Sequence, residues 1–155
     1  MAIKSFTGSR KEAAKTEETP IKVADYMTRK LITFSPEQGI SEVMETLLKQ
    51  RITGGPVVDS YQKLLGIISD SDLMKVIGDS RYFNMPVGKQ AVADYMSKDV
   101  ETIDADENIF NAAARFNETG HRRFPVIENG KLIGQISRMD VIIAAVKHKG
   151  NSWRT

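Results

Sequence analysis

The chain contains a duplication, and this feature constrains its fold more than any other. The segment 23–27, Val-Ala-Asp-Tyr-Met, recurs letter for letter at 92–96. Further matches keep one register apart from a single gap: Pro56-Val57 matches Pro125-Val126, Ile68-Ser69 matches Ile136-Ser137, and Asp72 matches Asp140. Self-similarity of this kind predicts two copies of one supersecondary unit, each too small to bury its apolar face alone.

Each copy has the same expected order of elements: strand, helix, strand, strand, helix. A short extended stretch, at 31–34 and at 100–103, comes before an amphipathic helix. The apolar stripe of that helix is formed by residues at helical spacing, namely Ile40, Val43, Met44, Leu47 and Leu48 in the first copy and Ile109, Ala112, Ala113 and Phe116 in the second. A hairpin follows, and Asn129-Gly130 favours the positive φ angles of a type I′ turn. We expect the closing helices at about 72–77 and 140–146.

These elements predict an α+β fold of two βαββα repeats packed about a pseudo-twofold axis. We expect the repeats at 21–78 and 92–148, with a linker at 79–91 that contains Pro86 and Gly88. Residues 1–20 are polar and lack periodicity, so they are expected to form a flexible arm. The tail, 149–155, carries Trp153, which is expected to dock on the body or on a partner chain. Packing of the two repeats should create clefts between them, where small ligands usually bind.

Composition argues against several classes of protein. The 155 residues are 41% hydrophobic and 27% charged, which is ordinary for a soluble domain. No apolar run is long enough for a membrane span, and residues 1–19 lack the apolar core of a secretory signal, so we expect a cytoplasmic protein. Zero cysteines and two histidines leave little material for a metal site, and a net charge of +2 with scattered basic residues does not indicate DNA binding.

Each hairpin ends in a Ser-x-x-Asp motif at the start of the closing helix, Ser69 to Asp72 and Ser137 to Asp140. One interpretation is structural: the motif is a capping box that satisfies free amides of the first helical turn. The other is functional, because free amides and the helix dipole favour an anion or a polar ligand there. A carboxylate at this position can also accept hydrogen bonds from both ribose hydroxyls. The two roles are compatible.

A basic segment, Gly120-His121-Arg122-Arg123, precedes the second hairpin. Guanidinium groups suit phosphate, although a solvated loop with surface partners is the alternative, and His121 is more simply a loop residue than a proton-transfer group. The first copy has Arg51-Ile52-Thr53-Gly54-Gly55 here, and only Arg51 is basic. Its glycines could let backbone amides approach a ligand or could form a plain loop. If both clefts bind, the arginine pair should give its cleft the ligand with more phosphate charge.

These motifs resemble those of tandem cystathionine-β-synthase-type (CBS) domains. The resemblance rests on the Val-Ala-Asp-Tyr-Met openings, the Gly-Gly-Pro-Val-Val and Arg-Phe-Pro-Val-Ile strands, and the Gly-Ile-Ile-Ser-x-x-Asp and Gly-Gln-Ile-Ser-x-x-Asp segments, and it covers about 21–147. It implies a disc-like pair, a Bateman module, that often forms homodimers. It also implies an adenosine ligand such as AMP, ADP, ATP or S-adenosylmethionine, with no obligatory cofactor.

The resemblance further implies which residues bind the ligand. Ribose and phosphate would be held by Ser69, Asp72, Ser137, Asp140, Arg122 and Arg123, with His121, Thr53 and Gly54 beside them. Adenine would be held by apolar residues near the extended stretch of the opposite copy and by the strand before the serine: Met27, Leu31, Thr33, Ile68 and Pro56, and Met96, Val100, Thr102, Ile136 and Pro125. Core filling is the alternative role of the two methionines.

We therefore predict a stand-alone regulatory protein that senses cellular energy state by binding an adenine nucleotide and acts on a separate enzyme or transporter. The alternative is a ligand-independent dimerisation scaffold with clefts filled by side chains. The sequence contains no nucleophile with a paired base, catalytic carboxylate dyad or Walker loop. We therefore expect no enzymatic activity.

Overall fold

The computed structural model describes residues 19–82, 86 and 89–152. Most of the arm expected at 1–20, and Trp153, lie outside these residues. The first copy has the 3-10 helix η1 (Val23–Asp25), α2 (Ile40–Gln50), β1 (Gly54–Val58), β2 (Leu64–Ser69) and α3 (Asp70–Tyr82). The second has η2 (Val92–Asp94), β3 (Ile103–Asp104), α4 (Ile109–Thr119), β4 (Arg123–Glu128), β5 (Lys131–Ser137) and α5 (Arg138–Ser152).

The strands form one small sheet in each copy. Strands β1 and β2 are antiparallel, as are β4 and β5, and β3 adds to β4 in parallel. The extended stretch expected at 31–34 is not a full strand, because it pairs only through a bridge from Phe34 to Val57. The expected turn at Asn129-Gly130 is present, with φ angles of 51° and 77°.

The helices differ from the expectation in one side chain and in their length. Ile40, Val43 and Leu47 are buried, but Leu48 is 82% exposed, because it lies at the edge of the stripe and none of the described elements covers it. The closing helices α3 and α5 begin at Asp70 and Arg138, directly after the motif serines, and extend well past the expected ends at about 77 and 146.

The opening segment of each copy, residues 23–27 in the first and 92–96 in the second, packs on the other copy. The backbone N–H of Val23 donates to the carbonyl of Glu107 at 2.8 Å, and that of Val92 donates to the carbonyl of Gln38 at 2.9 Å. Val23 and Met27 accordingly belong to the core of the second copy, whereas Val92 belongs to the core of the first. Separating the copies would expose these side chains to water, so each copy needs the other to complete its core.

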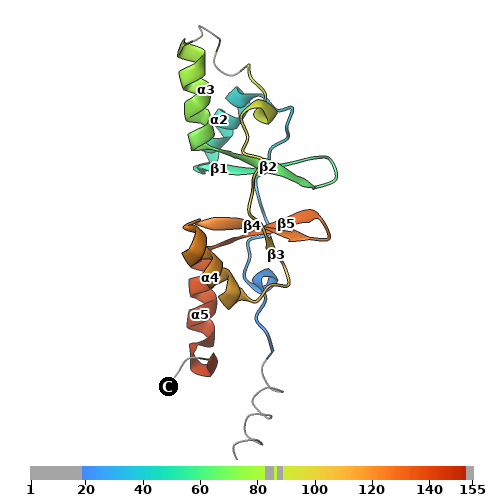
Figure 1. The fold of residues 1–155 in the computed structure, drawn as a ribbon, viewed down its shortest axis with the longest axis vertical. Helices are drawn as coiled ribbons and strands as arrows, with labels where there is room; N and C mark the ends of the chain where they lie inside the picture. The colour runs from blue at the N-terminus through green and yellow to red at the C-terminus, as the bar shows by residue number, and fades with distance from the viewer. Residues whose placement is uncertain (1–18, 83–85, 87–88, 153–155) are drawn as a thin grey trace, which may run out of the picture.

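The arrangement brings the starts of the two closing helices to the boundary between the copies. Helices α3 and α5 both begin at this boundary and run away from it in opposite directions (Figure 1). In this view α2 and α3 lie above the β1–β2 sheet, and α4 and α5 lie below the sheet of β3, β4 and β5. Within the described part of the chain, no helix is long and apolar enough to cross a membrane.

Candidate functional site

Both Ser-x-x-Asp motifs form tight turns between a strand and a helix. We call residues 69–72 the first turn and residues 137–140 the second turn. The backbone N–H of Ser69 donates to Oδ2 of Asp72 at 2.8 Å, and that of Ser137 donates to Oδ2 of Asp140 at the same distance. In the second turn, the N–H of Asp140 also donates to the hydroxyl of Ser137 at 3.2 Å. The second turn therefore has both bonds of the expected capping box, whereas the first turn has the bond from the serine N–H to the aspartate but no bond from any described helix amide to the serine oxygen.

The first turn is closed by protein groups. Asp72 is only 6% exposed. Its Oδ2 also accepts a hydrogen bond from the hydroxyl of Ser69 at 3.1 Å, and its Oδ1 accepts one from the hydroxyl of Ser97 at 3.4 Å. Ser97 follows the second opening segment, and it exchanges backbone hydrogen bonds with Ile67. Sequence reasoning missed Ser97, and the available signal was its position directly after the repeated Val-Ala-Asp-Tyr-Met.

The second turn is more open. Asp140 is half-buried, and among the described residues no donor reaches its Oδ1. Arg123 stands directly across the β4–β5 pair from Ser137, so the predicted phosphate-binding and ribose-binding residues share one edge of this sheet. Arg122 and Arg123 are exposed, and within the described chain their side chains have no ion-pair partner.

Arg138 holds the loop that carries these arginines. Its Nε donates to the carbonyl of His121 at 2.9 Å and its Nη2 donates to the carbonyl of Gly120 at 3.0 Å. Its backbone N–H donates to the carbonyl of Arg122 at 3.2 Å. Arg138 was not among the predicted site residues, although its place between Ser137 and Asp140 was a usable signal.

The corresponding edge of the first copy has no room for a side chain. Gly54 stands across from Ser69, as Arg123 does from Ser137. A Cβ atom at Gly54 would lie 2.6 Å from the carbonyl oxygen of Ile68. An arginine is therefore sterically excluded at this position, and the neighbouring Thr53 is uncharged.

His121 lies against the second copy's surface. Its Nε2 is 3.9 Å from Oε2 of Glu101, and its ring meets that of Phe124 edge-on with centroids 5.5 Å apart. Arg115 approaches the same Glu101 oxygen at 3.6 Å. These contacts fit the loop role considered for His121.

The residues expected to hold adenine occupy different environments. Each methionine packs against a glycine of the opposite copy, Met27 against Gly134 and Met96 against Gly66. The packing is close, because a Cβ atom at either glycine would lie within 3.0 Å of the methionine sulfur. The side chains of Ile68 and Ile136 are fully buried, and those of Pro56 and Pro125 are buried as well. Leu31 is half-buried and Thr33 is exposed.

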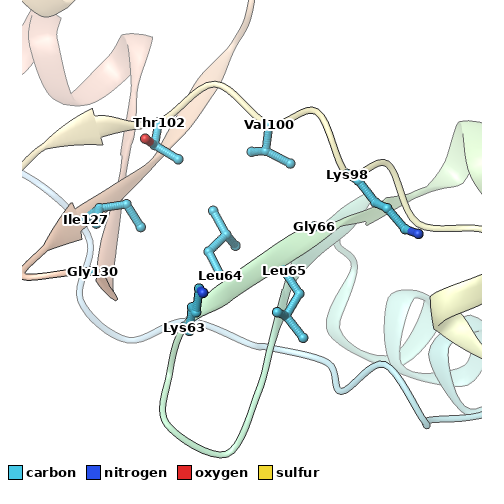
Figure 2. A pocket seen from close by; sticks show the side chains of 9 residues that line it. All are labelled: Lys63, Leu64, Leu65, Gly66, Lys98, Val100, Thr102, Ile127 and Gly130. Atoms are coloured by element: carbon cyan, nitrogen blue, oxygen red, sulfur yellow. The ribbon is translucent and has the colours of Figure 1, made fainter.

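Val100 and Thr102 line a cavity between the hairpins of the two copies (Figure 2). Its volume is about 220 Å³, and it is lined by Lys63, Leu64, Leu65, Gly66, Lys98, Val100, Thr102, Ile127 and Gly130. Apolar and polar surface contribute about equally to the walls, and the two lysines bring positive charge. The volume is below the roughly 300–1,000 Å³ of ordinary small-molecule pockets, so the cavity suits a planar base better than a complete nucleotide.

Comparison with known proteins identifies the duplicated unit. A family model described as CBS domain matches residues 23–79 and 92–147. The chain belongs to the CBS-domain family. The resemblance and the α+β fold of two repeats expected from the sequence are thereby confirmed.

Several relatives are themselves CBS pairs. The crystal structure of CBSX2 in complex with AMP is 31% identical, with a TM-score of 0.71, and the match covers 83% of this chain and 98% of that one. The CBS domain pair of protein MJ0100, in complex with 5′-methylthioadenosine and S-adenosyl-L-methionine, has a TM-score of 0.66 at 24% identity and covers 84% of this chain and 99% of that one, which shows a common fold.

Curated relatives are longer than the matched region. CBSX1 of Arabidopsis thaliana, a CBS domain-containing protein named as chloroplastic, is 31% identical over 85% of this chain and 67% of its own length. Protein MJ1225 of Methanocaldococcus jannaschii is 28% identical over 84% of this chain and 44% of its own length. Because one relative is chloroplastic, the cytoplasmic location stays a prediction.

Proposed function

We propose that this CBS pair binds an adenine nucleotide at the boundary between its copies and acts as a regulatory sensor. The observation that carries the proposal is the second turn, where Arg123 stands across from Ser137 and Asp140 has a carboxylate oxygen without a protein donor. Arginine, serine and aspartate supply the three kinds of contact that a phosphorylated ribose requires.

The chemistry of the second turn follows from its groups. The carboxylate of Asp140 accepts hydrogen bonds from ribose hydroxyls, as an acidic residue does in dinucleotide-binding folds. The start of α5 presents the positive end of a helix dipole, which favours a negative group. Arg123 and Arg122 add permanent charge and paired N–H donors for phosphate oxygens. Adenine would lie on the extended stretch of the opposite copy, with the half-buried Leu31 and the exposed Thr33 as candidates.

The relatives support the choice of ligand class. CBSX2, at 31% identity, is known in complex with AMP. We therefore propose AMP, ADP or ATP as the ligand and keep S-adenosylmethionine as the adenosyl alternative. Binding would regulate a separate protein through a difference in ligand affinity between two states of the pair. We propose no catalytic step.

We propose that the protein forms a homodimer with a second molecule of the same chain. Met74 on α3 and Ile142 on α5 occupy corresponding places in the repeat and are 62% and 51% exposed. Ile77, Ile143 and Val146 extend this apolar surface on the same two helices. A symmetric homodimer would bury this surface against the same surface of a second molecule.

Titration calorimetry with AMP, ADP, ATP and S-adenosylmethionine tests the proposal. We expect saturable heat with at least one of them at protein concentrations of some tens of micromolar. The scaffold alternative predicts no heat with any of the four. It also predicts that Asp140→Ala lowers stability only, whereas a sensor with this substitution loses ligand affinity.

A further inference from the structure

The two Ser-x-x-Asp turns are built from matching sequence but differ in charge. The residue after the serine is Asp70 in the first turn and Arg138 in the second. The first turn therefore carries two carboxylates, those of Asp70 and Asp72. The second carries the single carboxylate of Asp140 and has three arginines at or beside it: Arg122, Arg123 and Arg138.

This difference changes how each helix start can receive an anion. The positive end of a helix dipole attracts negative groups, but acidic side chains in the first helical turn already satisfy it. Helix α3 has Asp70 and Asp72 in its first turn, whereas α5 has Asp140 there. An incoming phosphate would meet like charge at the first turn and opposite charge at the second.

Asp72 and Asp140 also differ in their hydrogen bonds. Both carboxylate oxygens of Asp72 already accept protein hydrogen bonds, and the hydroxyl on Oδ1 comes from Ser97, a residue of the segment that the other copy contributes. Asp72 thus ties the second opening segment to the first copy. Among the described residues, Oδ1 of Asp140 has no such partner. A ribose hydroxyl can bind there without displacing a protein donor.

Steric space gives the third difference. The position across the hairpin from the serine holds Arg123 in the second copy and Gly54 in the first. A Cβ atom at Gly54 would come within 2.6 Å of a backbone oxygen, so the first copy cannot place a cation there. Charge, hydrogen bonding and the room for a cation across from the serine all favour the second turn.

We infer that the protein has a single site for a phosphorylated nucleotide, at the second turn, and that Asp72 serves to tie the copies together. Arg138 is a positioning residue for this site, because its guanidinium group holds the carbonyls of Gly120 and His121 and so orients the two arginines. The inference rests on the proposed function and states which of the two related turns performs it. It also predicts that the phosphate makes a large contribution to affinity.

Titration calorimetry of the full chain with AMP and with adenosine tests this inference. We expect one AMP per chain, bound at least about tenfold more tightly than adenosine, as the loss of one charged hydrogen bond would predict. Asp140→Asn should abolish or weaken AMP binding by at least about tenfold. Arg123→Ala should remove the preference for AMP over adenosine. Glu118→Gln and Lys49→Ala, exposed substitutions of matching charge change on α4 and α2, should leave both affinities unchanged.

Each possible result decides the question. Two AMP molecules per chain, full AMP binding in Asp140→Asn, or an unchanged preference for AMP over adenosine in Arg123→Ala would each overturn the inference and leave the proposed function intact. No binding of any adenine nucleotide by the wild-type protein would overturn both. Circular dichroism shows whether each variant is folded. If Asp140→Asn does not fold, Arg123→Ala still tests the inference, because it changes only an exposed side chain.

Discussion

Replacement of Gly134 by alanine tests how the two copies are held together. A Cβ atom at this position would lie 2.7 Å from the sulfur of Met27 and 2.8 Å from the carbonyl oxygen of Thr28. Thr28 is fixed by two backbone hydrogen bonds to Gln135, of 2.8 and 2.9 Å, so the oxygen cannot move away without loosening this pairing. The added methyl group must therefore push the first opening segment off the second copy.

The expected cost follows from the cost of overpacking a filled core. Inserting a methyl group into such a site destabilises a protein by about 1–3 kcal/mol. For a chain of this size, each kcal/mol corresponds to a shift of about 2–4 °C in Tm. We therefore expect Gly134→Ala to lower the free energy of unfolding in urea by about 1–3 kcal/mol, with a lower Tm.

Gly78→Ala is the matched control. Gly78 lies within α3, and a Cβ atom there would meet nothing within 4 Å. Alanine in a helix interior is favoured over glycine by about 0.5–1 kcal/mol, so this variant should be slightly more stable than the wild type. A Gly134→Ala protein as stable as the wild type would contradict this expectation, because the opening segment would then not be packed against β5.

Three further predictions concern single side chains. Ser97→Ala should lower the free energy of unfolding by less than about 1 kcal/mol, because it removes only a long hydrogen bond to Asp72; a larger loss in urea denaturation would contradict this. Burial, together with the hydrogen bond to Asp79 and the charges of Asp79 and Asp94, raises the pKa of Tyr95 above its ordinary 10.0. The hydrogen bond from Tyr95 to Asp79 should therefore stabilise the fold fully below pH 10, and this stabilisation should disappear as the pH rises through the raised pKa. The difference in free energy of unfolding between the wild type and Tyr95→Phe should thus shrink at alkaline pH, and a difference that does not change with pH would contradict the prediction. Ile142→Lys should convert a homodimer into monomers in analytical ultracentrifugation, and an unchanged sedimentation coefficient would exclude this surface as the interface.

The sequence predicts features that depend on local chemistry. The Asn129-Gly130 turn forms as expected because both residues tolerate positive φ, and this preference does not depend on the rest of the fold. The capping bonds from Ser69 and Ser137 are equally local. The stripe on α2 was predicted except at Leu48, because periodicity identifies a helical face but does not say how far a neighbouring element covers it.

Features that depend on long-range packing could not be predicted in the same way. The opening segments 23–27 and 92–96 are identical, so their residues cannot reveal which copy each one packs on. The contact of Ser97 with Asp72 depends on that exchange. The unequal number of arginines in the sequence indicates part of the difference between the two turns, but the burial of Asp72 and the lack of space at Gly54 depend on contacts between distant segments.

A crystal structure of the protein grown with AMP tests the central claim most directly. We expect one nucleotide per chain, with its ribose hydroxyls on Asp140 and its phosphate on Arg123, while the hydroxyl of Ser97 stays on Asp72. Nucleotide density at the first turn alone, or a phosphate directed away from Arg122 and Arg123, would contradict the proposed single site at the second turn.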